Sequence, residues 1–244
     1  MTGAGRGIGR AVAVGLAQAG VTVALVARSR DELAETAGQV KEMGGDALVV
    51  PADLGDPVQA ASIIERTTGE LGPVGILINN AAVVWPLGPS VQVKPAEWGA
   101  ALQVNAVAPA VLTLALLPAM LEAKWGRIVN VSSGIAARPG AMAGMNAYTT
   151  SKAALEAHTL NLAAELTGTG VTVNAFRPGS VDTAMQAWIR AQDPTKIGAA
   201  LHERFEKSHA AGTLITPGAS ARSLLDHLSS DGTGNIWEAA RPGG

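Results

Sequence analysis

The sequence predicts an α/β fold, a doubly wound parallel sheet with helices on both faces and a single domain over residues 1–244. Short β-branched apolar runs alternate with helical patterns of ten or more residues, and this alternation is typical of a parallel sheet. The length of 244 residues suits one large domain. No linker, repeat or low-complexity tract divides the chain.

The first half of the chain alternates helix and strand. The β-branched run over 21–26 is bounded by glycine and arginine, which is typical of a buried strand. The helical pattern over 31–43 stops at a pair of glycines, as helices commonly do. Asp56 is a suitable N-cap, and Pro57 suits the first position of a helix that runs to Leu71. A helix over 11–19 and strands over 47–50 and 74–78 complete this half.

The second half continues the same alternation. A helix is expected from Pro95 to about Lys124, with a kink caused by its internal prolines. A long helix is expected from Tyr148 to Leu166, where glycines end it. Residues 184–216 are richer in charge, and we expect a helical excursion that forms a lid over the substrate site. Strands over 127–131, 171–176 and 235–238 and a helix over 219–228 complete the fold.

Composition excludes several classes of protein. With 48% hydrophobic and 16% charged residues, wholesale disorder is excluded. A net charge of −2 leaves no basic footprint for nucleic acid or for an anionic membrane. Cysteine is absent, which excludes disulfides and a cysteine nucleophile, and the four histidines have no metal-ligand spacing. The histidine spacing predicts no metal site. The apolar stretch 106–121 is too short to span a bilayer, so we expect a soluble, cytoplasmic protein.

Glycines at Gly3, Gly5, Gly7 and Gly9 precede the first helical run. Glycine lets the backbone approach a phosphate closely, and a helix N-terminus presents free N–H groups and positive potential. The pattern therefore indicates a phosphate-binding turn with the spacing T-G-x-x-x-G-x-G, which starts at Thr2. A tight turn without a ligand is the alternative.

Tyr148 and Lys152 lie four residues apart, so a helix places both side chains on one face. A free tyrosine, with a pKa near 10, is a poor proton donor at neutral pH, but a neighbouring ammonium favours the phenolate. The pair is therefore a chemically sensible acid–base catalyst. A surface tyrosine packed on a lysine stem is the alternative.

Polar side chains follow two of the predicted strands at their carboxyl ends, where open α/β sheets bind ligands. Ser132 and Ser133 follow one strand, and a serine there can donate a hydrogen bond to a carbonyl oxygen, although loop capping is the alternative. Asn79 and Asn80 end another strand. Asn105 lies within an apolar helix, and a buried asparagine must find partners, so it has a structural or a catalytic role.

Taken in order, these motifs resemble those of the short-chain dehydrogenase/reductase family over essentially the whole chain. The resemblance implies a Rossmann-like fold, with Tyr148 as general acid/base and Ser133 polarising the substrate carbonyl. It implies that Lys152 holds the nicotinamide ribose and lowers the pKa of Tyr148, and that Asn105 holds a water in a proton relay. The implied cofactor-binding residues are Thr2, Gly3, Arg6, Gly7, Ile8, Gly9, Arg28, Asp53, Leu54, Asn79, Ala81, Tyr148, Lys152, Pro178, Gly179, Val181 and Thr183.

The sequence departs from the family pattern in three places. Ala82 replaces a glycine, and the loop between Ser133 and Tyr148 is longer by a couple of residues, which leaves Ser132 as the less favoured alternative to Ser133. The family also places a strand before its glycine turn, whereas Thr2 is the second residue here. We expect that this first strand is missing because the start of the sequence is misplaced. If residues 1–244 are the true product, the strands on either side lose a pairing partner, and we expect a poorly folded or inactive chain.

The cofactor is expected to be NADP(H) rather than NAD(H). Enzymes that use NAD place a carboxylate after the second strand of such folds, but this chain has Ala27 and Arg28 there. Arg28 and Arg6 would bind a 2′-phosphate, which a carboxylate would repel. The alternative is that Arg28 and Arg30 are solvated charges at the start of a helix.

The expected reaction is hydride transfer between the nicotinamide and a ketone or secondary alcohol of modest size. The candidate substrate-lining residues are Trp85, Met142, Met145, Met185 and Trp188, with ordinary core packing as the alternative. A non-catalytic cofactor-binding protein, a dehydratase or epimerase, and a purely structural oligomer are the rival functions. The helices over 96–123 and 148–167 are apolar enough to bury a subunit interface, and the resemblance implies a homodimer or homotetramer. No nucleic-acid or membrane partner is expected.

Overall fold

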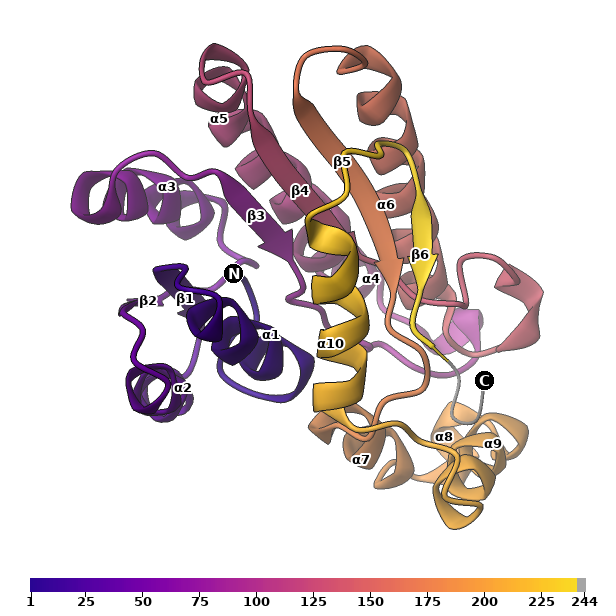
Figure 1. The fold of residues 1–244 in the computed structure, drawn as a ribbon. Coiled ribbons are helices and arrows are strands. Elements are labelled where there is room, and N and C mark those ends of the chain that lie inside the picture. Colours follow the sequence, from indigo (N-terminus) through magenta and orange to yellow (C-terminus); the bar gives the residue numbers. More distant parts are fainter. Residues whose placement is uncertain (241–244) are drawn as a thin grey trace.

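A computed structural model describes residues 1–240, in which six parallel strands alternate with helices (Figure 1). The sheet is built in two parts. Strands β1 (Val23–Ala27) and β2 (Ala47–Pro51) pair with each other, and β3 (Ile76–Asn79), β4 (Gly126–Val131), β5 (Val171–Arg177) and β6 (Ile236–Glu238) form the second part in that order. All pairings are parallel, so every carboxyl end lies at the same edge. The predicted parallel α/β fold is confirmed.

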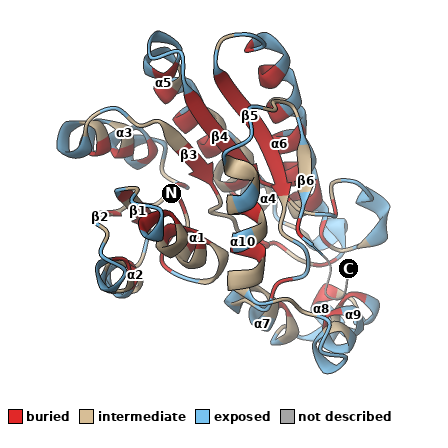
Figure 2. Cartoon of the chain, in the orientation of Figure 1, coloured by how far each residue is buried: buried red, intermediate tan, exposed pale blue. Residues whose placement is uncertain are grey.

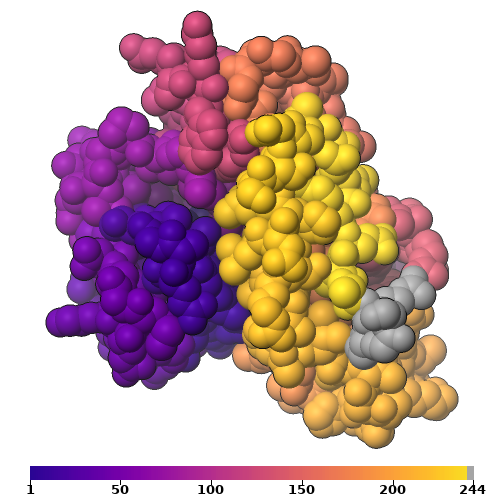
Figure 3. All heavy atoms as spheres, viewed as in Figure 1, coloured from indigo at the N-terminus to yellow at the C-terminus, as the bar shows by residue number. Residues whose placement is uncertain are grey.

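Helices cover both faces of this sheet and enclose two cores (Figures 1 and 2). One core contains side chains of α1 (Gly7–Gln18), α2 (Arg30–Glu42) and α10 (Pro217–Leu228). The other lies between the sheet and α3 (Pro57–Leu71), α5 (Ala108–Glu122) and α6 (Asn146–Glu165). The space-filling view shows α1 (indigo) beside α10 (golden) on one surface (Figure 3). This two-sided burial explains why the strand sequences are apolar at nearly every position.

The long apolar helix is interrupted, as expected, and the break lies just before Pro109, whose missing N–H cannot bond to the carbonyl of Asn105. Helix α4 (Pro95–Leu102) leads into a π-helical turn, η2 (Gln103–Val107), and then into α5. Pro118 lies inside α5 without ending it. The wider turn places Asn105 in the protein interior, where it finds polar partners. By length and composition the stretch Pro95–Glu122 could cross a membrane, contrary to the expectation of too short a span; in this fold it packs on α3, α6 and β4.

Residues 184–216 form the predicted helical excursion. It contains α7 (Ala184–Arg190), α8 (Pro194–Ile197) and α9 (Ala199–Ala210). Their apolar side chains, among them Ile189 and Phe205, form a small cluster with Val84 and Ile135, which follow β3 and β4. Short 3-10 turns lie at η1 (Ser90–Gln92) and η3 (Pro139–Ala141). The excursion therefore packs over the carboxyl edge of the sheet.

The two parts of the sheet are joined through the first four residues. The Thr2 amide donates to the Ile78 carbonyl at 3.0 Å, and the Val26 amide donates to the Met1 carbonyl at 3.0 Å. The Ala4 amide in turn donates to the Val26 carbonyl at 3.1 Å. Among the described residues 1–240, β1 and β3 do not pair with each other directly, but Met1 and Thr2 bridge them at one end. Beside this bridge a groove of about 350 Å³ runs between β1 and β3.

Candidate active site

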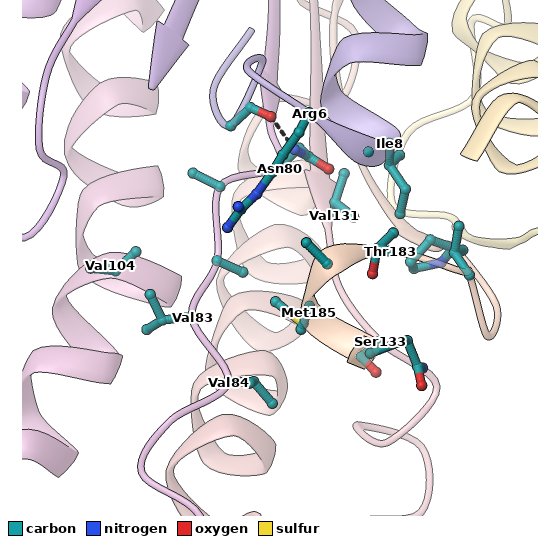
Figure 4. A pocket seen from close by; sticks show the side chains of 18 of the residues that line it. Arg6, Ile8, Asn80, Val83, Val84, Val104, Val131, Ser133, Thr183 and Met185 are labelled. Atoms are coloured by element: carbon teal, nitrogen blue, oxygen red, sulfur yellow. Dashed lines mark hydrogen bonds between the residues drawn. The ribbon is translucent and has the colours of Figure 1, made fainter. Parts of the chain in front are cut away.

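A cavity of about 650 Å³ lies along the carboxyl edge of the sheet (Figure 4). Its walls come from the glycine turn, the ends of β1, β3, β4 and β5, and the start of α7. Arg6 and Ser133 lie at opposite ends of the view. The predicted site residues that line it are Gly3, Arg6, Gly7, Ile8, Arg28, Asp53, Leu54, Ala81, Ser133, Tyr148, Lys152, Pro178, Gly179, Val181 and Thr183.

The glycine turn is shaped to accept a phosphate group. Gly3 and Gly7 have φ angles of 64° and 55°, in the left-handed region that favours glycine. A Cβ on Gly9 would lie 2.0 Å from the Gly3 carbonyl oxygen, so no other residue fits there. Helix α1 begins at this turn and has no side-chain N-cap, which leaves its first N–H groups available to an anion. These features fit the diphosphate of a dinucleotide.

The end of the cavity near β1 carries charges of both signs. Arg28 is exposed and lines the cavity wall. Arg6 is paired with Glu32, with 3.2 Å between Nη1 and Oε1. The sequence analysis did not anticipate Glu32, which lies on the first turn of α2 and also lines the cavity. Arg6, Arg28 and Glu32 therefore line this end of the cavity, and Asp53, which follows β2, lines the same cavity.

Ser133, Tyr148 and Lys152 meet at the other end of the cavity. The phenol of Tyr148 has Ser133 as a hydrogen-bonding neighbour. The Lys152 amine lies 5.8 Å from the centroid of the Tyr148 ring and donates to the Val131 carbonyl at 2.7 Å. Lys152 is only 2% exposed although it lines the cavity. The helix and strand that carry these residues thus bring a phenol, a hydroxyl and an amine together.

Burial shifts both ionisable groups toward their neutral forms. It lowers the pKa of Lys152 from 10.5 to about 8, and the negative charge of Glu156 opposes this shift. It also raises the pKa of Tyr148, and hydrogen bonding to Ser133 opposes that rise. Loss of water around the phenolate outweighs the other contributions to the pKa of Tyr148, and the expectation that Lys152 lowers this pKa stays a prediction. At neutral pH the phenol carries its proton.

The two adjacent serines point to different partners. Both serines line the cavity, but the Ser132 hydroxyl donates to the Glu156 carboxylate at 2.7 Å. The Ser133 hydroxyl neighbours Tyr148 and accepts from the Ile135 amide at 3.4 Å. The geometry therefore favours Ser133, the predicted choice, as the hydroxyl that can reach a ligand.

Four predicted site residues lie behind the cavity and not on its wall. The Thr2 hydroxyl accepts from the Asn80 and Ala81 amides at 3.0 and 3.1 Å, which holds the glycine turn against the end of β3. Asn79 donates to the Asn130 side chain at 2.9 Å, within the sheet. Gly9 packs on the turn itself. These residues support the cavity through its backbone.

Asn105 is the fourth of these residues, and its side chain is fully engaged. It accepts from the Val83 amide and donates to the Val83 carbonyl, both at 2.8 Å, and donates to the Ser151 hydroxyl at 3.0 Å. Ser151 in turn donates to the Tyr148 carbonyl at 2.8 Å. The structure therefore places Asn105 as a brace between the loop after β3 and the first turn of α6. The implied role of Asn105 in holding a water stays a prediction.

The wall around Ser133 and Tyr148 is mostly apolar. Met142, Met145 and Met185 line it as predicted, whereas Trp85 and the exposed Trp188 do not. Gln186 adds an amide. The lining residues that sequence reasoning missed include Asn80, Val83, Val84, Ile135, Gln186, Ile189 and Phe205.

A comparison with protein families agrees with this site. The model of the short chain dehydrogenase family matches residues 1–194. The chain belongs to this family. Its fold, glycine turn and clustered serine, tyrosine and lysine are thus those of a short-chain dehydrogenase/reductase, a family of oxidoreductases.

Three known members illustrate the similarity. A short chain dehydrogenase of Pseudocercospora fijiensis is 41% identical over 210 residues, which cover 85% of this chain and 65% of that protein. The 3-oxoacyl-[acyl-carrier-protein] reductase FabG of Pseudomonas aeruginosa is 32% identical over 225 residues and 90% of each chain. The crystal structure of L-sorbose reductase from Gluconobacter frateurii, complexed with NADPH and L-sorbose, superposes with a TM-score of 0.86 at 25% identity, covering 99% of this chain and 94% of that one.

Proposed function

We propose that this protein is an NADP(H)-dependent carbonyl reductase or alcohol dehydrogenase. It transfers a hydride between the nicotinamide and a ketone or secondary alcohol of modest size, with Tyr148 as the acid/base. One observation carries this proposal. A single cavity has an anion-binding glycine turn in one wall and Ser133, Tyr148 and Lys152 in another. A merely cofactor-binding protein has no need for an acid, a hydroxyl and a buried amine beside the same cavity.

The cofactor supplies the hydride when it is bound. Residues of the protein donate the proton and stabilise the negative charge that develops on the carbonyl oxygen. Ser133 donates a hydrogen bond to the carbonyl oxygen and favours the developing negative charge there. Tyr148, which is protonated at neutral pH, donates its proton to that oxygen. Lys152 keeps a positive charge beside the phenol below a pH of about 8 and so stabilises the phenolate that results.

The preference for NADP(H) rests on Arg28 and Arg6. Both line the end of the cavity away from Ser133, and each charged hydrogen bond to a 2′-phosphate contributes roughly 1.5–3 kcal/mol. Glu32 neutralises part of this charge through its ion pair with Arg6, so Arg28 is the main determinant. The NADPH complex of L-sorbose reductase supports the same choice. Measuring kcat/KM with both cofactors tests it, and a preference for NADH would overturn it.

The lining near Ser133 and Tyr148 supports an uncharged substrate. Apart from Lys152, the side chains of Val84, Ile135, Met145, Met185 and Gln186 there carry no charge. A carboxylate or phosphate placed among them would lose its hydration without a new partner, which is costly. A neutral ketone with an apolar body and one further polar group fits this wall. L-Sorbose, the ligand of the similar reductase, is likewise uncharged.

Reduction of a ketone panel with NADPH tests the proposal. The panel pairs each neutral ketone with a keto acid of similar size, and we expect turnover of the neutral members only. Tyr148→Phe removes the proton donor while the ring stays in place, so kcat should fall by about 10²–10⁴-fold. Binding of NADPH and the thermal midpoint should stay close to wild type. A Tyr148→Phe variant that turns over within tenfold of wild type would exclude the acid/base role.

We also propose a cytoplasmic homodimer or homotetramer in which residues 184–216 act as a lid. Exposed apolar side chains follow one face of η2 and α5, namely Val107, Val111, Leu114 and Leu121. Leu160 of α6 is exposed as well. Apolar stripes of this kind are typical of subunit interfaces. Sedimentation velocity should give a dimer or tetramer, and a monomer at micromolar concentration would contradict this assignment.

A further inference from the structure

A third ionisable residue lies on the helix face that carries Tyr148 and Lys152. Glu156 follows Lys152 by four residues on α6, so the three side chains repeat once per turn along one face. Glu156 is 7% exposed and lies behind the cavity, not on its wall. An ionised carboxylate at such a depth is costly unless charged partners compensate it. Its partners therefore show what it does.

Arg177 holds this carboxylate in a two-pronged ion pair. Its Nε and Nη2 atoms donate to the two carboxylate oxygens of Glu156, each at 2.8 Å. Its Nη1 atom donates to Glu238 on β6 at 3.0 Å. This fork geometry fixes the orientation of the Glu156 carboxylate. The end of β5, which carries Arg177, is thus tied to the middle of α6.

The same carboxylate reaches the strand end that carries the active-site serine. The oxygen of Glu156 that accepts from Arg177 Nε also accepts from the Ser132 hydroxyl at 2.7 Å. Successive side chains of an extended chain point to opposite sides. Anchoring Ser132 to Glu156 therefore turns the next side chain, Ser133, toward Tyr148.

The charge of Glu156 also acts on the buried amine. Besides Lys152 and Glu156 on α6, two more charged side chains lie nearby, Arg177 on β5 and Glu238 on β6. The phenol of Tyr148 is the remaining titratable neighbour of Lys152. Burial lowers the pKa of Lys152, and Glu156 is the charge that opposes this shift. Without Glu156 the amine would lose its proton at a lower pH.

We propose that Glu156 is a positioning residue of this active site, which fixes Ser133 through Ser132 and keeps the Lys152 amine in its charged form. This inference rests on the proposed function for its effect on turnover. The part that concerns Lys152 is a property of the protein without cofactor or substrate. The two parts can therefore be tested separately.

The test compares Glu156→Gln, which removes the charge while keeping the shape, with Glu156→Asp, which keeps the charge. Titration of Lys152 by heteronuclear NMR, in the protein without cofactor, should give a pKa lower by about one unit in Glu156→Gln. Glu156→Asp should stay closer to wild type. In turnover assays the decline of kcat/KM for reduction at high pH should begin about one pH unit lower in Glu156→Gln.

Glu165→Gln is the matched control, because it removes the same charge from an exposed position on the same helix. It should leave both the Lys152 titration and the pH profile unchanged. An unchanged Lys152 pKa in folded Glu156→Gln, or an equal shift in the control, would overturn the proposal. If Glu156→Gln does not fold, Glu156→Asp replaces it, because the shorter side chain moves the carboxylate relative to Lys152. A Lys152 pKa lowered by part of a unit then supports the proposal, and a pKa equal to wild type counts against it. Absence of turnover with every ketone would refute the proposed function and leave the NMR result standing.

Discussion

Lys152 is subject to two opposing requirements. As an ammonium it can stabilise a phenolate, yet its amine is buried and has the Val131 carbonyl as its hydrogen-bond partner at 2.7 Å. Its pKa falls from 10.5 to about 8, so the folded protein binds this proton less tightly than the unfolded chain does. Between pH 8 and 10.5 the unfolded state binds more protons, and the free energy of unfolding must rise with pH. Below pH 8 the buried charge destabilises the fold.

Lys152→Met should therefore be more stable and inactive. Methionine keeps an unbranched apolar chain but carries no charge, so at pH 7 the free energy of unfolding should rise by about 1–3 kcal/mol. The stability of wild type should increase between pH 8 and 10.5 relative to the variant. Urea unfolding across this pH range measures both effects. Lys41→Met, at an exposed position, is the control, and a Lys152→Met protein less stable than wild type at pH 7 would contradict the argument.

The sequence predicted the serine, tyrosine and lysine at the cavity, but not Glu32 on its wall or Glu156 behind it. Ser133, Tyr148 and Lys152 belong to short motifs with fixed spacing, and the structure brings them together. Glu32 and Glu156 form ion pairs with arginines in other segments, Arg6 and Arg177 respectively. Neither pairing leaves a local signature, because the partners are separated by more than twenty residues in the sequence. Such networks become visible only once the elements are packed.

Asn105 connects three elements through one side chain. It binds the loop after β3 at both polar groups of Val83 and reaches α6 through Ser151. The π-helical turn places this side chain inside, where it is fully buried. Its removal would leave the Val83 amide and carbonyl without partners. The loop that forms the cavity wall beside Val84 would then lose its anchor.

Asn105→Ala should lower both stability and turnover. Each polar group left unpaired costs roughly 1–3 kcal/mol, so the free energy of unfolding should fall by about 2–4 kcal/mol in urea titrations. Because Ser151 also holds the Tyr148 backbone, kcat should fall more than KM rises. Gln103→Ala changes the same turn at a side chain with no hydrogen bond among those described, and it serves as the control. Equal losses in the two variants would exclude a bracing role for Asn105.

The elements themselves were predictable from local signals. β-Branched runs and glycine stops placed each of the six strands within two residues of its observed start, since these signals act within a few residues. The break in the long helix lies at Asn105, four residues before Pro109, and not at Pro118; at Asn105 the Val83 backbone supplies polar partners from a distant loop. Hydrophobic periodicity is read from one helix at a time, so it does not predict a contact between that helix and a distant loop.

The two-part sheet leaves polar backbone groups along the groove between β1 and β3. The carbonyls of Ala24 and Ile78 accept hydrogen bonds from Met1 and Thr2 at 3.0 Å. Backbone groups alternate in direction along a strand, so the Ala24 amide and both polar groups of Ile76 face the same groove. Burial also lowers the pKa of the Met1 amine to about 5. A peptide N–H at that position would remove the cost of burying a charge.

Adding five β-branched apolar residues ahead of Met1 should therefore stabilise the protein by pairing with β1 and β3. Several new hydrogen bonds and buried side chains should raise the thermal midpoint by about 5–15 °C. A glycine–serine extension of equal length is the control, because it also converts the Met1 amine to an amide but packs poorly. Hydrogen exchange of the Ala24 and Ile76 amides should slow only with the apolar extension. Equal midpoints for the two extensions, with both amides still exchanging freely, would show that the groove does not accept a strand.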